Sequence, residues 1–203
     1  MRLVLASGSP RRRRLLRALW PDLVVVPSVA VERAGGSPEE DVADNARAKA
    51  EEVAGRDQGV IIGADTEVVC GESVLGKPAS RSDAAAMLRR LSGGTHKVIT
   101  ALHVIDTRNG RRSSAVERTQ VSFRAVGDEE IERYLDRGEY ADKAGGYGIQ
   151  GAAALFVERI DGDYYNVMGL PLCRLGGMLE AFGVSLLDAA PPRGTDRTGG
   201  TDG

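Results

Sequence analysis

Four consecutive arginines, Arg11 to Arg14, directly follow a Ser-Gly-Ser-Pro segment near the start of the chain. The preceding residues, 2–6, are mostly apolar and predict a strand, whereas Ser9 and Pro10 are typical of the first positions of a helix. A helix N-terminus offers free backbone N–H groups, and arginine guanidinium groups bind phosphate oxygens well. With the hydroxyl of Ser7, the segment indicates an anion site. The alternative interpretation is a helix face exposed to solvent.

A second group of polar residues lies in GADTEVVCGESVLGKP, residues 63–78. Asp65 follows an apolar stretch, where an unpaired buried carboxylate would be costly. We therefore expect Asp65 at a strand end, facing a metal ion or a reacting water. Lys77 lies in a Gly-Lys-Pro turn and is a candidate ligand of the same phosphates. The alternative is an ordinary hairpin with an incidental aspartate and lysine.

A third polar group is spread among glycines in residues 138–172. It contains Asp142, Lys143, Gln150 and Asn166. The Gln150 amide can both donate and accept a hydrogen bond, which suits the edge of a uracil or thymine base. A single glutamine in such a loop is also common as a structural residue, so the spacing alone does not decide between these interpretations.

The overall composition narrows the class of protein. Lysine and arginine total 27 and aspartate and glutamate total 29, a balance that argues against a dedicated nucleic-acid binder. No apolar run reaches the roughly 18–20 residues that span a bilayer, and no signal peptide precedes the first strand. Cys70 and Cys173 have no metal-ligand spacing and are expected to be buried thiols of a reducing compartment. We therefore expect a cytoplasmic enzyme or regulator without a membrane partner.

The elements that must position the polar groups alternate between strands and helices. Strands are predicted at 2–6, from Leu23, at 59–70 with an interruption at 63–66, at 97–106, at 114–124 and at 153–159. Helices are predicted at 11–19, 37–54, 80–91, 128–137 and 171–182. This order predicts an α/β domain with a mixed sheet over residues 1–187. Residues 188–203 are rich in Pro, Gly and Thr and predict a disordered tail.

Several motifs, read together in chain order, resemble those of one family. They are SGSPRR, GADTEVV with GKP, LSGGTHKVIT, and DKAGGYGIQG with ERIDGDYYNVMGLPL. This set is similar to the Maf family of nucleoside-triphosphate pyrophosphatases over roughly residues 2–184. The resemblance implies an elongated α/β fold with flanking helices in two lobes around a cleft, like that of the inosine-triphosphate pyrophosphatases.

The resemblance also implies a reaction. A nucleoside triphosphate would be hydrolysed to the monophosphate and pyrophosphate with a divalent cation, Mg²⁺ or Mn²⁺. The GYGIQG motif points to the branch that acts on dTTP and UTP. A homodimer is implied as well, although no surface in the sequence demonstrates one.

The family pattern suggests a role for each matching position. Asp65 resembles the proton acceptor that activates water, and Lys77 a second catalytic residue. Glu32 and Asp65 are the implied metal ligands. The implied substrate-binding residues are Ser7, Arg11, Arg12, Lys49, Thr66 and Gln150, of which Arg11, Thr66 and Gln150 match the positions that set base specificity. Arg11 and Arg12 are thus expected to face the substrate, and Arg13 and Arg14 to remain in solvent.

The chain departs from the family pattern at three positions. Arg14 stands at a usual Glu, Asn45 at a usual Leu and Ala153 at a usual Gly. Two other functions stay open from sequence. One is a broad pyrophosphatase that removes non-canonical nucleotides, and the other is a nucleotide-responsive regulator of cell division and septum formation in which hydrolysis is incidental.

Overall fold

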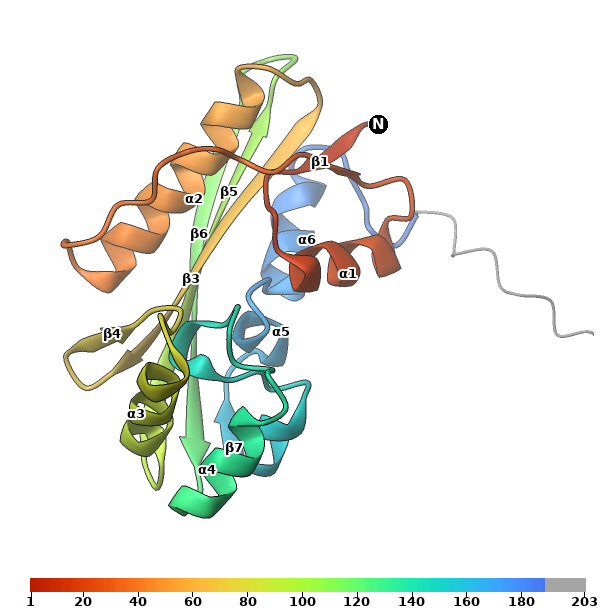
Figure 1. The fold of residues 1–203 in the computed structure, drawn as a ribbon. Coiled ribbons are helices and arrows are strands. Elements are labelled where there is room, and N and C mark those ends of the chain that lie inside the picture. The colour runs from red at the N-terminus through yellow and green to blue at the C-terminus, as the bar shows by residue number, and fades with distance from the viewer. Residues whose placement is uncertain (189–203) are drawn as a thin grey trace, which may run out of the picture.

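The computed structural model describes residues 1–188, and its main feature is one long mixed sheet (Figure 1). Its seven strands are β1 (Leu3–Leu5), β2 (Val24–Val25), β3 (Val60–Cys70), β4 (Ser73–Leu75), β5 (Thr95–Asp106), β6 (Arg112–Phe123) and β7 (Val157–Asp161). The α-helices are α1 (Pro10–Leu19), α2 (Pro38–Ala54), α3 (Arg81–Leu91), α4 (Asp128–Leu135), α5 (Tyr164–Val167) and α6 (Leu172–Glu180). Two short 3₁₀ helices, η1 (Ala144–Gly146) and η2 (Ala152–Leu155), lie between α4 and β7.

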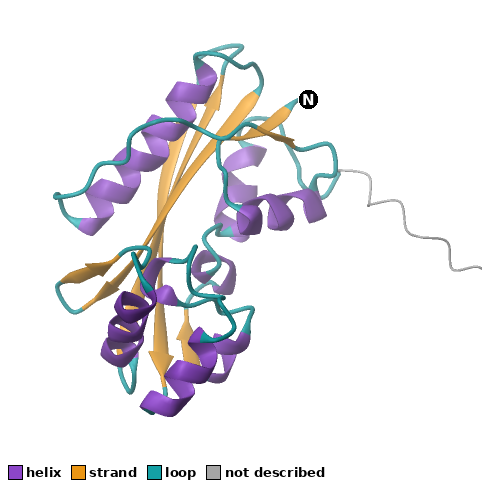
Figure 2. Cartoon of the chain, in the orientation of Figure 1, coloured by secondary structure: helices purple, strands orange, loops and turns teal. Residues whose placement is uncertain are grey.

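The strands follow the order β2-β1-β3-β5-β6-β7, with β4 added to β3. The long strands β3, β5 and β6 are antiparallel and run the length of the molecule, whereas β1 and β2 are parallel to their neighbours. This arrangement confirms the mixed sheet expected from the alternation of elements. The sheet carries helices at both of its ends, which gives two lobes joined by the same three strands (Figure 2).

Side chains alternate along β3 and divide one lobe into two layers. Val60 and Ile62 face a core shared with Leu16 of α1 and Leu175 of α6. Ile61, on the other face, packs in a core under α2. The other lobe has a separate core in which α3, α4 and the two 3₁₀ helices cover the far ends of β3, β5 and β6.

Most predicted elements are confirmed, and three predictions are wrong. β3 is continuous through residues 63–66, because its backbone pairs with β5 without a break there. The strand predicted over 153–159 begins only at Val157, since η2 occupies residues 152–155. The strand expected from Leu23 is reduced to β2, two residues long.

The cysteines also differ from the prediction. Cys70 is half-buried at the end of β3, and Cys173 is exposed on α6, so neither is a fully buried thiol, and both are free. The predicted tail lies outside the described residues, apart from Asp188. Within residues 1–188, no helix combines the length and the apolar character needed to cross a membrane.

Candidate functional site

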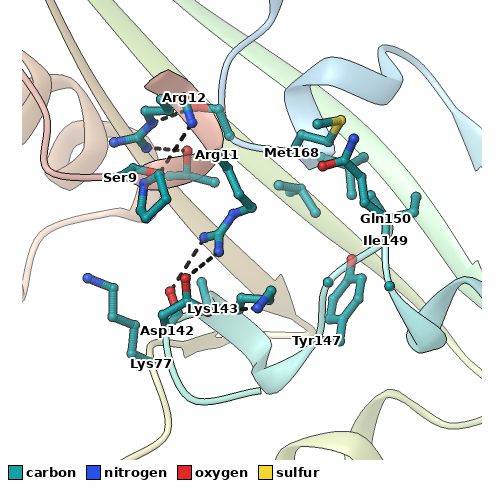
Figure 3. A pocket seen from close by; sticks show the side chains of 18 of the residues that line it. Ser9, Arg11, Arg12, Lys77, Asp142, Lys143, Tyr147, Ile149, Gln150 and Met168 are labelled. Atoms are coloured by element: carbon teal, nitrogen blue, oxygen red, sulfur yellow. Dashed lines mark hydrogen bonds and ion pairs between the residues drawn. The ribbon is translucent and has the colours of Figure 1, made fainter. Parts of the chain in front are cut away.

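A cavity of about 600 Å³ lies between the two lobes (Figure 3). Residues from the first turn of α1, from β3, from the loop after β4, and from the segments 139–151 and 167–169 line it. Six of the residues predicted from sequence share this cavity, namely Ser7, Arg11, Arg12, Thr66, Lys77 and Gln150. Two other predicted residues, Glu32 and Lys49, and the Asp65 side chain belong to a neighbouring cluster on the opposite face of β3.

The Ser-Gly-Ser-Pro segment forms the predicted N-terminus of α1. The Ser9 hydroxyl accepts a hydrogen bond from the Arg12 backbone N–H at 3.4 Å, and Pro10 occupies the first turn. Ser7 Oγ accepts from the Ser9 backbone N–H at 3.2 Å. No acidic residue lies in the first turn, so the positive end of the helix dipole is not neutralised there. This turn can bind an anion that enters the cavity.

Arg12 lines the cavity and is buried, with 8% of its surface exposed. Its Nε donates to the Gly169 carbonyl at 2.7 Å and its Nη1 donates to the Ala64 carbonyl at 2.9 Å. Its Nη2 donates to Thr66 Oγ1 at 2.8 Å. Burial lowers the pKa of Arg12 below its ordinary value, while the charge of Asp65 opposes this effect. Arg12 therefore joins α1 to β3 and to the segment between α5 and α6, and it adds positive charge with most of its donors already occupied.

Arg12 occupies a gap in the sheet. β1 pairs with residues 60–62 of β3 and β4 pairs with residues 68–70, both on the edge that β5 does not use. Residues 63–67 therefore have no strand partner on that edge within the described part of the chain. Asp65 and Thr66 point to opposite faces, yet both border this open edge. The gap explains how groups from the two faces can act on one ligand.

Asp65 lies in the middle of β3 and not at a strand end, so that prediction is wrong. It pairs with Ala101 of β5, and only 8% of its surface is exposed. Lys49 Nζ donates to Asp65 Oδ1 at 2.6 Å, and Asn45 Nδ2 donates to Oδ2 at 3.1 Å. These two donors compensate the burial of the charge, which is why the carboxylate does not need a strand end.

Lys49 lies between two carboxylates. Besides Asp65, its Nζ contacts Glu32 Oε1 at 2.5 Å. This hydrogen bond lowers the pKa of Glu32 below its ordinary value against the effect of burial, and the charges of Lys49, Lys77 and Arg12 act in the same direction. The cations that line the cavity therefore act electrostatically on this second cluster.

The close approach of α2 to β3 depends on Gly63. A Cβ at this position would lie 2.1 Å from the Ala46 carbonyl oxygen, so only glycine leaves room for the helix. The contact brings Asn45 and Lys49, which are one helical turn apart, over Asp65. Sequence reasoning missed the role of Asn45 and treated it as a departure from the family. Its spacing of four residues from Lys49 was the available signal.

Glu67 is a second group that sequence reasoning missed. It lies on the same face of β3 as Asp65, two residues further on. Its Oε2 atom is buried and has no hydrogen-bond partner within residues 1–188. Burial raises the pKa of Glu67 to about 7, and the charges of Asp65, Asp41 and Glu32 add to the shift. The cluster therefore contains a carboxyl group that ionises near neutral pH.

Less polar residues line the part of the cavity near Gln150. Ile149 and Met168 lie beside Gln150, and Tyr147 lies below them in Figure 3. Tyr147 is fixed from behind by His96 of β5, whose Nε2 is 2.7 Å from the Tyr147 hydroxyl. His96 was missed because an isolated histidine in an apolar strand has no motif. These residues can contact the faces of a planar ring while Gln150 contacts the edge of that ring.

Arg11 crosses the cavity to the loop after α4. Its Nη1 donates to Asp142 Oδ2 at 2.7 Å, and Lys143 Nζ lies 2.7 Å from Asp142 Oδ1. Among residues 1–188, Lys77 and Arg14 form no ion pair, and both line the cavity. Arg13 is exposed as expected, whereas Arg14 is exposed and still borders the cavity.

Comparison with known proteins identifies the family. The family model described as "Maf-like protein" matches residues 2–182. The chain belongs to the Maf family. It is 51% identical over 170 residues to the dTTP/UTP pyrophosphatase of Thermococcus gammatolerans, a match that covers 84% of this chain and 91% of that protein. It is 47% identical over 191 residues to the dTTP/UTP pyrophosphatase of Alkaliphilus metalliredigens, covering 92% and 99% of the two chains.

A solved structure shares the fold of this Maf protein. The Ham1 protein of Staphylococcus aureus superimposes with a TM-score of 0.53 and 14% sequence identity, over 90% of this chain and 100% of that one. This likeness confirms the elongated α/β fold that the sequence resemblance implied.

Proposed function

We propose that this protein hydrolyses dTTP and UTP to their monophosphates and pyrophosphate. Its membership of the Maf family and the names of its similar relatives support this activity. The observation that carries the proposal is the arrangement of the cavity. One part contains the first turn of α1 together with Lys77 and Arg14, which form no ion pair within residues 1–188. Another part contains Gln150 beside Ile149 and Met168.

The triphosphate binds at the first turn of α1 in this proposal. Within residues 1–188, the backbone N–H groups of Gly8 and Arg11 form no hydrogen bond and the ammonium group of Lys77 has no carboxylate partner, so these donors can bind phosphate. Arg12 adds positive charge beside these donors, and hydrogen bonds to the Thr66 hydroxyl and to two backbone carbonyls fix the orientation of its guanidinium. Stabilising the charge on the leaving pyrophosphate is the main task of these groups.

Asp65 is the proposed acceptor of the proton from the attacking water. Asp65 is the neighbour on β3 of Thr66, which lines the cavity, and Lys49 and Asn45 fix the orientation of the Asp65 carboxylate. A fixed carboxylate can orient a water molecule and accept its proton as the P–O bond to pyrophosphate breaks. Lys49 also keeps Glu32 and Asp65 close together despite their like charges.

In this proposal, Glu32 and Asp65 hold a divalent cation together with the phosphates of the substrate. Mg²⁺ is commonly held by one or two carboxylates together with substrate phosphates and waters. Glu32 has one carboxylate oxygen outside its contact with Lys49, whereas both oxygens of Asp65 accept hydrogen bonds, one from Lys49 and one from Asn45. Within residues 1–188, no three Asp, Glu, His or Cys side chains form a metal-binding group, so the substrate phosphates and waters would have to supply the remaining ligands. These two residues would hold the ion, which when bound would neutralise charge on the triphosphate.

The decisive experiment measures which phosphate product is released. We would incubate the protein with Mg²⁺ and UTP, dTTP, CTP or methylated nucleotides, and quantify pyrophosphate and orthophosphate separately. Asp65→Asn should lower turnover by about a hundredfold or more, since general acid–base catalysis contributes on that scale. Asp44→Asn, which alters an exposed ion pair on the same helix as Lys49, is the matched control.

Each outcome separates one function from another. Pyrophosphate from UTP and dTTP, lost in Asp65→Asn, supports the proposal. Comparable rates on methylated nucleotides would favour the broad pyrophosphatase, and orthophosphate alone would refute cleavage at the α–β bond. Nucleotide binding with no turnover above that of Asp65→Asn would favour the regulatory protein.

A further inference from the structure

The Gln150 amide cannot by itself distinguish uracil from cytosine. Uracil and thymine present an N3–H donor and an O4 acceptor, whereas cytosine presents an N3 acceptor and an exocyclic amine donor. A side-chain amide has one acceptor and one donor group, and rotation by 180° exchanges them. Gln150 is exposed and forms no side-chain hydrogen bond within residues 1–188, so nothing there fixes its orientation. Discrimination requires a second group that can only donate or only accept.

Arg11 is such a group, because a guanidinium carries N–H donors and no acceptor. It lines the same cavity as Gln150. In Figure 3, Lys77 and Gln150 lie on opposite sides of the Arg11 guanidinium, so Arg11 stands between the unpaired cation and the amide. A donor fixed in this place would donate a hydrogen bond to the O4 carbonyl of uracil and repel the exocyclic amine of cytosine.

Asp142 holds Arg11 in this position. Its Oδ2 accepts from Arg11 Nη1 at 2.7 Å, and its backbone carbonyl accepts from Arg11 Nη2 at 3.4 Å. Its other carboxylate oxygen accepts from Lys143 Nζ at 2.7 Å. Burial alone would raise the pKa of Asp142, but the hydrogen bond of Lys143 and the charge of Arg11 lower it below its ordinary value. Asp142 is therefore an anion that orients the guanidinium from the opposite lobe.

The distribution of counter-ions supports a base-reading task for Arg11. Lys77 and Arg14 form no ion pair within residues 1–188, which suits them to a polyanion. The Arg11 guanidinium is already paired with the Asp142 carboxylate, which neutralises its charge, so its remaining N–H groups are better matched to a neutral carbonyl than to a phosphate. Cations without a carboxylate partner thus mark the phosphate part of the cavity, and the paired cation Arg11 marks the part that binds the base.

We propose that Asp142 is a positioning residue that makes the cavity prefer uracil and thymine to cytosine, by holding Arg11 as a fixed donor opposite Gln150. This inference rests on the proposed function for the identity of the substrate. Asp142 touches no reacting atom in this scheme, so its loss changes substrate selection more than the chemical step.

The test compares UTP with CTP in Asp142→Ala. The ratio of kcat/KM for UTP to that for CTP should fall by about tenfold or more, because a tenfold change corresponds to about 1.4 kcal/mol and Asp142 holds Arg11 through a charge-assisted hydrogen bond. The loss should come mainly from a higher KM for UTP, with kcat little changed. Asp142→Asn, which keeps an acceptor oxygen but no charge, should give an intermediate ratio. Asp136→Ala, which breaks the exposed ion pair with Arg81 outside the cavity, should leave the ratio unchanged.

Folding should survive the substitution. The Asp142 side chain is 56% exposed, and an exposed ion pair contributes little to stability. An unchanged midpoint of thermal unfolding would therefore accompany the change in ratio. A ratio within twofold of the wild-type value would overturn the inference. Tighter binding of UTP and CTP alike would also overturn it, since Asp142 would then only compete with phosphate for Arg11.

A binding measurement separates this inference from the proposed function. Calorimetric titration with UMP and CMP needs no turnover, and the wild-type preference for UMP should shrink in Asp142→Ala. If the wild-type protein released no pyrophosphate from any nucleotide, the proposed function would fail while this comparison still decided the role of Asp142. Equal affinities of the wild-type protein for UMP and CMP would refute base reading by Arg11 directly.

Discussion

Lowering the pH should destabilise this protein through His96, the buried histidine behind the cavity. His96 is 2% exposed, and its ring meets Phe123 and Tyr147 edge-on at centroid distances of 5.1 and 5.3 Å. Its Nδ1 atom has no hydrogen-bond partner in residues 1–188. Burial lowers the pKa of His96 to about 4. The folded state therefore holds a neutral imidazole at pH values where the unfolded chain binds a proton.

The sign and size of the effect follow from proton linkage. Between the ordinary histidine pKa of about 6.5 and the folded value of about 4, the unfolded state binds more protons, so stability falls as the pH falls. At about 1.36 kcal/mol per pKa unit, the complete loss is about 3 kcal/mol. About 2.5 kcal/mol of this should be lost between pH 7.5 and pH 4.5.

Urea unfolding of the wild-type protein and His96→Gln at both pH values isolates this contribution. The glutamine amide can replace Nε2 as the partner of Tyr147 but does not titrate. The wild-type protein should lose about 2.5 kcal/mol more than His96→Gln on acidification. Burial lowers the pKa of His103 as well, but His103 is present in both proteins and cancels from the difference. Equal losses in the two proteins would show that His96 is not held neutral in the folded state.

Three further predictions concern the neighbourhood of the cavity. Gly63→Ala should lower the free energy of unfolding by about 3 kcal/mol, because the new Cβ would collide with the Ala46 carbonyl; a change below about 1 kcal/mol in urea unfolding would contradict the close approach. Glu67→Gln should raise the free energy of unfolding by about 1 kcal/mol at pH 8 and leave it unchanged at pH 4. The reason is that ionising the half-buried Glu67 carboxyl destabilises the wild-type protein as the pH rises from the unfolded-state pKa through about 7. An equal effect of the substitution at both pH values would contradict this reasoning. Lys77→Met should raise KM for UTP by roughly tenfold in steady-state kinetics, whereas Lys97→Met outside the cavity should not; equal KM values for the two variants would remove Lys77 from the phosphate site.

The sequence was sufficient for features that depend on neighbouring residues. Ser9 and Pro10 mark the start of α1, and Ser37 with Glu40 marks the start of α2, because capping is a contact within one helical turn. The alternation of strands and helices was enough to predict the mixed sheet. The motifs were also sufficient to identify the family, whose model matches residues 2–182.

The position of Asp65 shows where local reasoning fails. From the sequence, a carboxylate after an apolar stretch looked too costly to bury within a strand. The structure buries it mid-strand because Asn45 and Lys49 donate to it from a helix that precedes β3 in the chain. The helix can approach only because Gly63 has no side chain. No spacing rule along the chain reports such a contact between two elements.

Tertiary structure alone decided how the cavity is built. Arg11 meets Asp142 across 131 residues of sequence, and His96 meets Tyr147 across 51. Such pairs form because the sheet brings the two lobes together along β3, β5 and β6, and because, within residues 1–188, β3 has no strand partner between β1 and β4. The sequence determined which chemical groups the protein has, through local patterns of capping, alternation and motif. Only the folded sheet determined which of those groups face one another, because hydrogen bonds and charges act over distances in space and not along the chain.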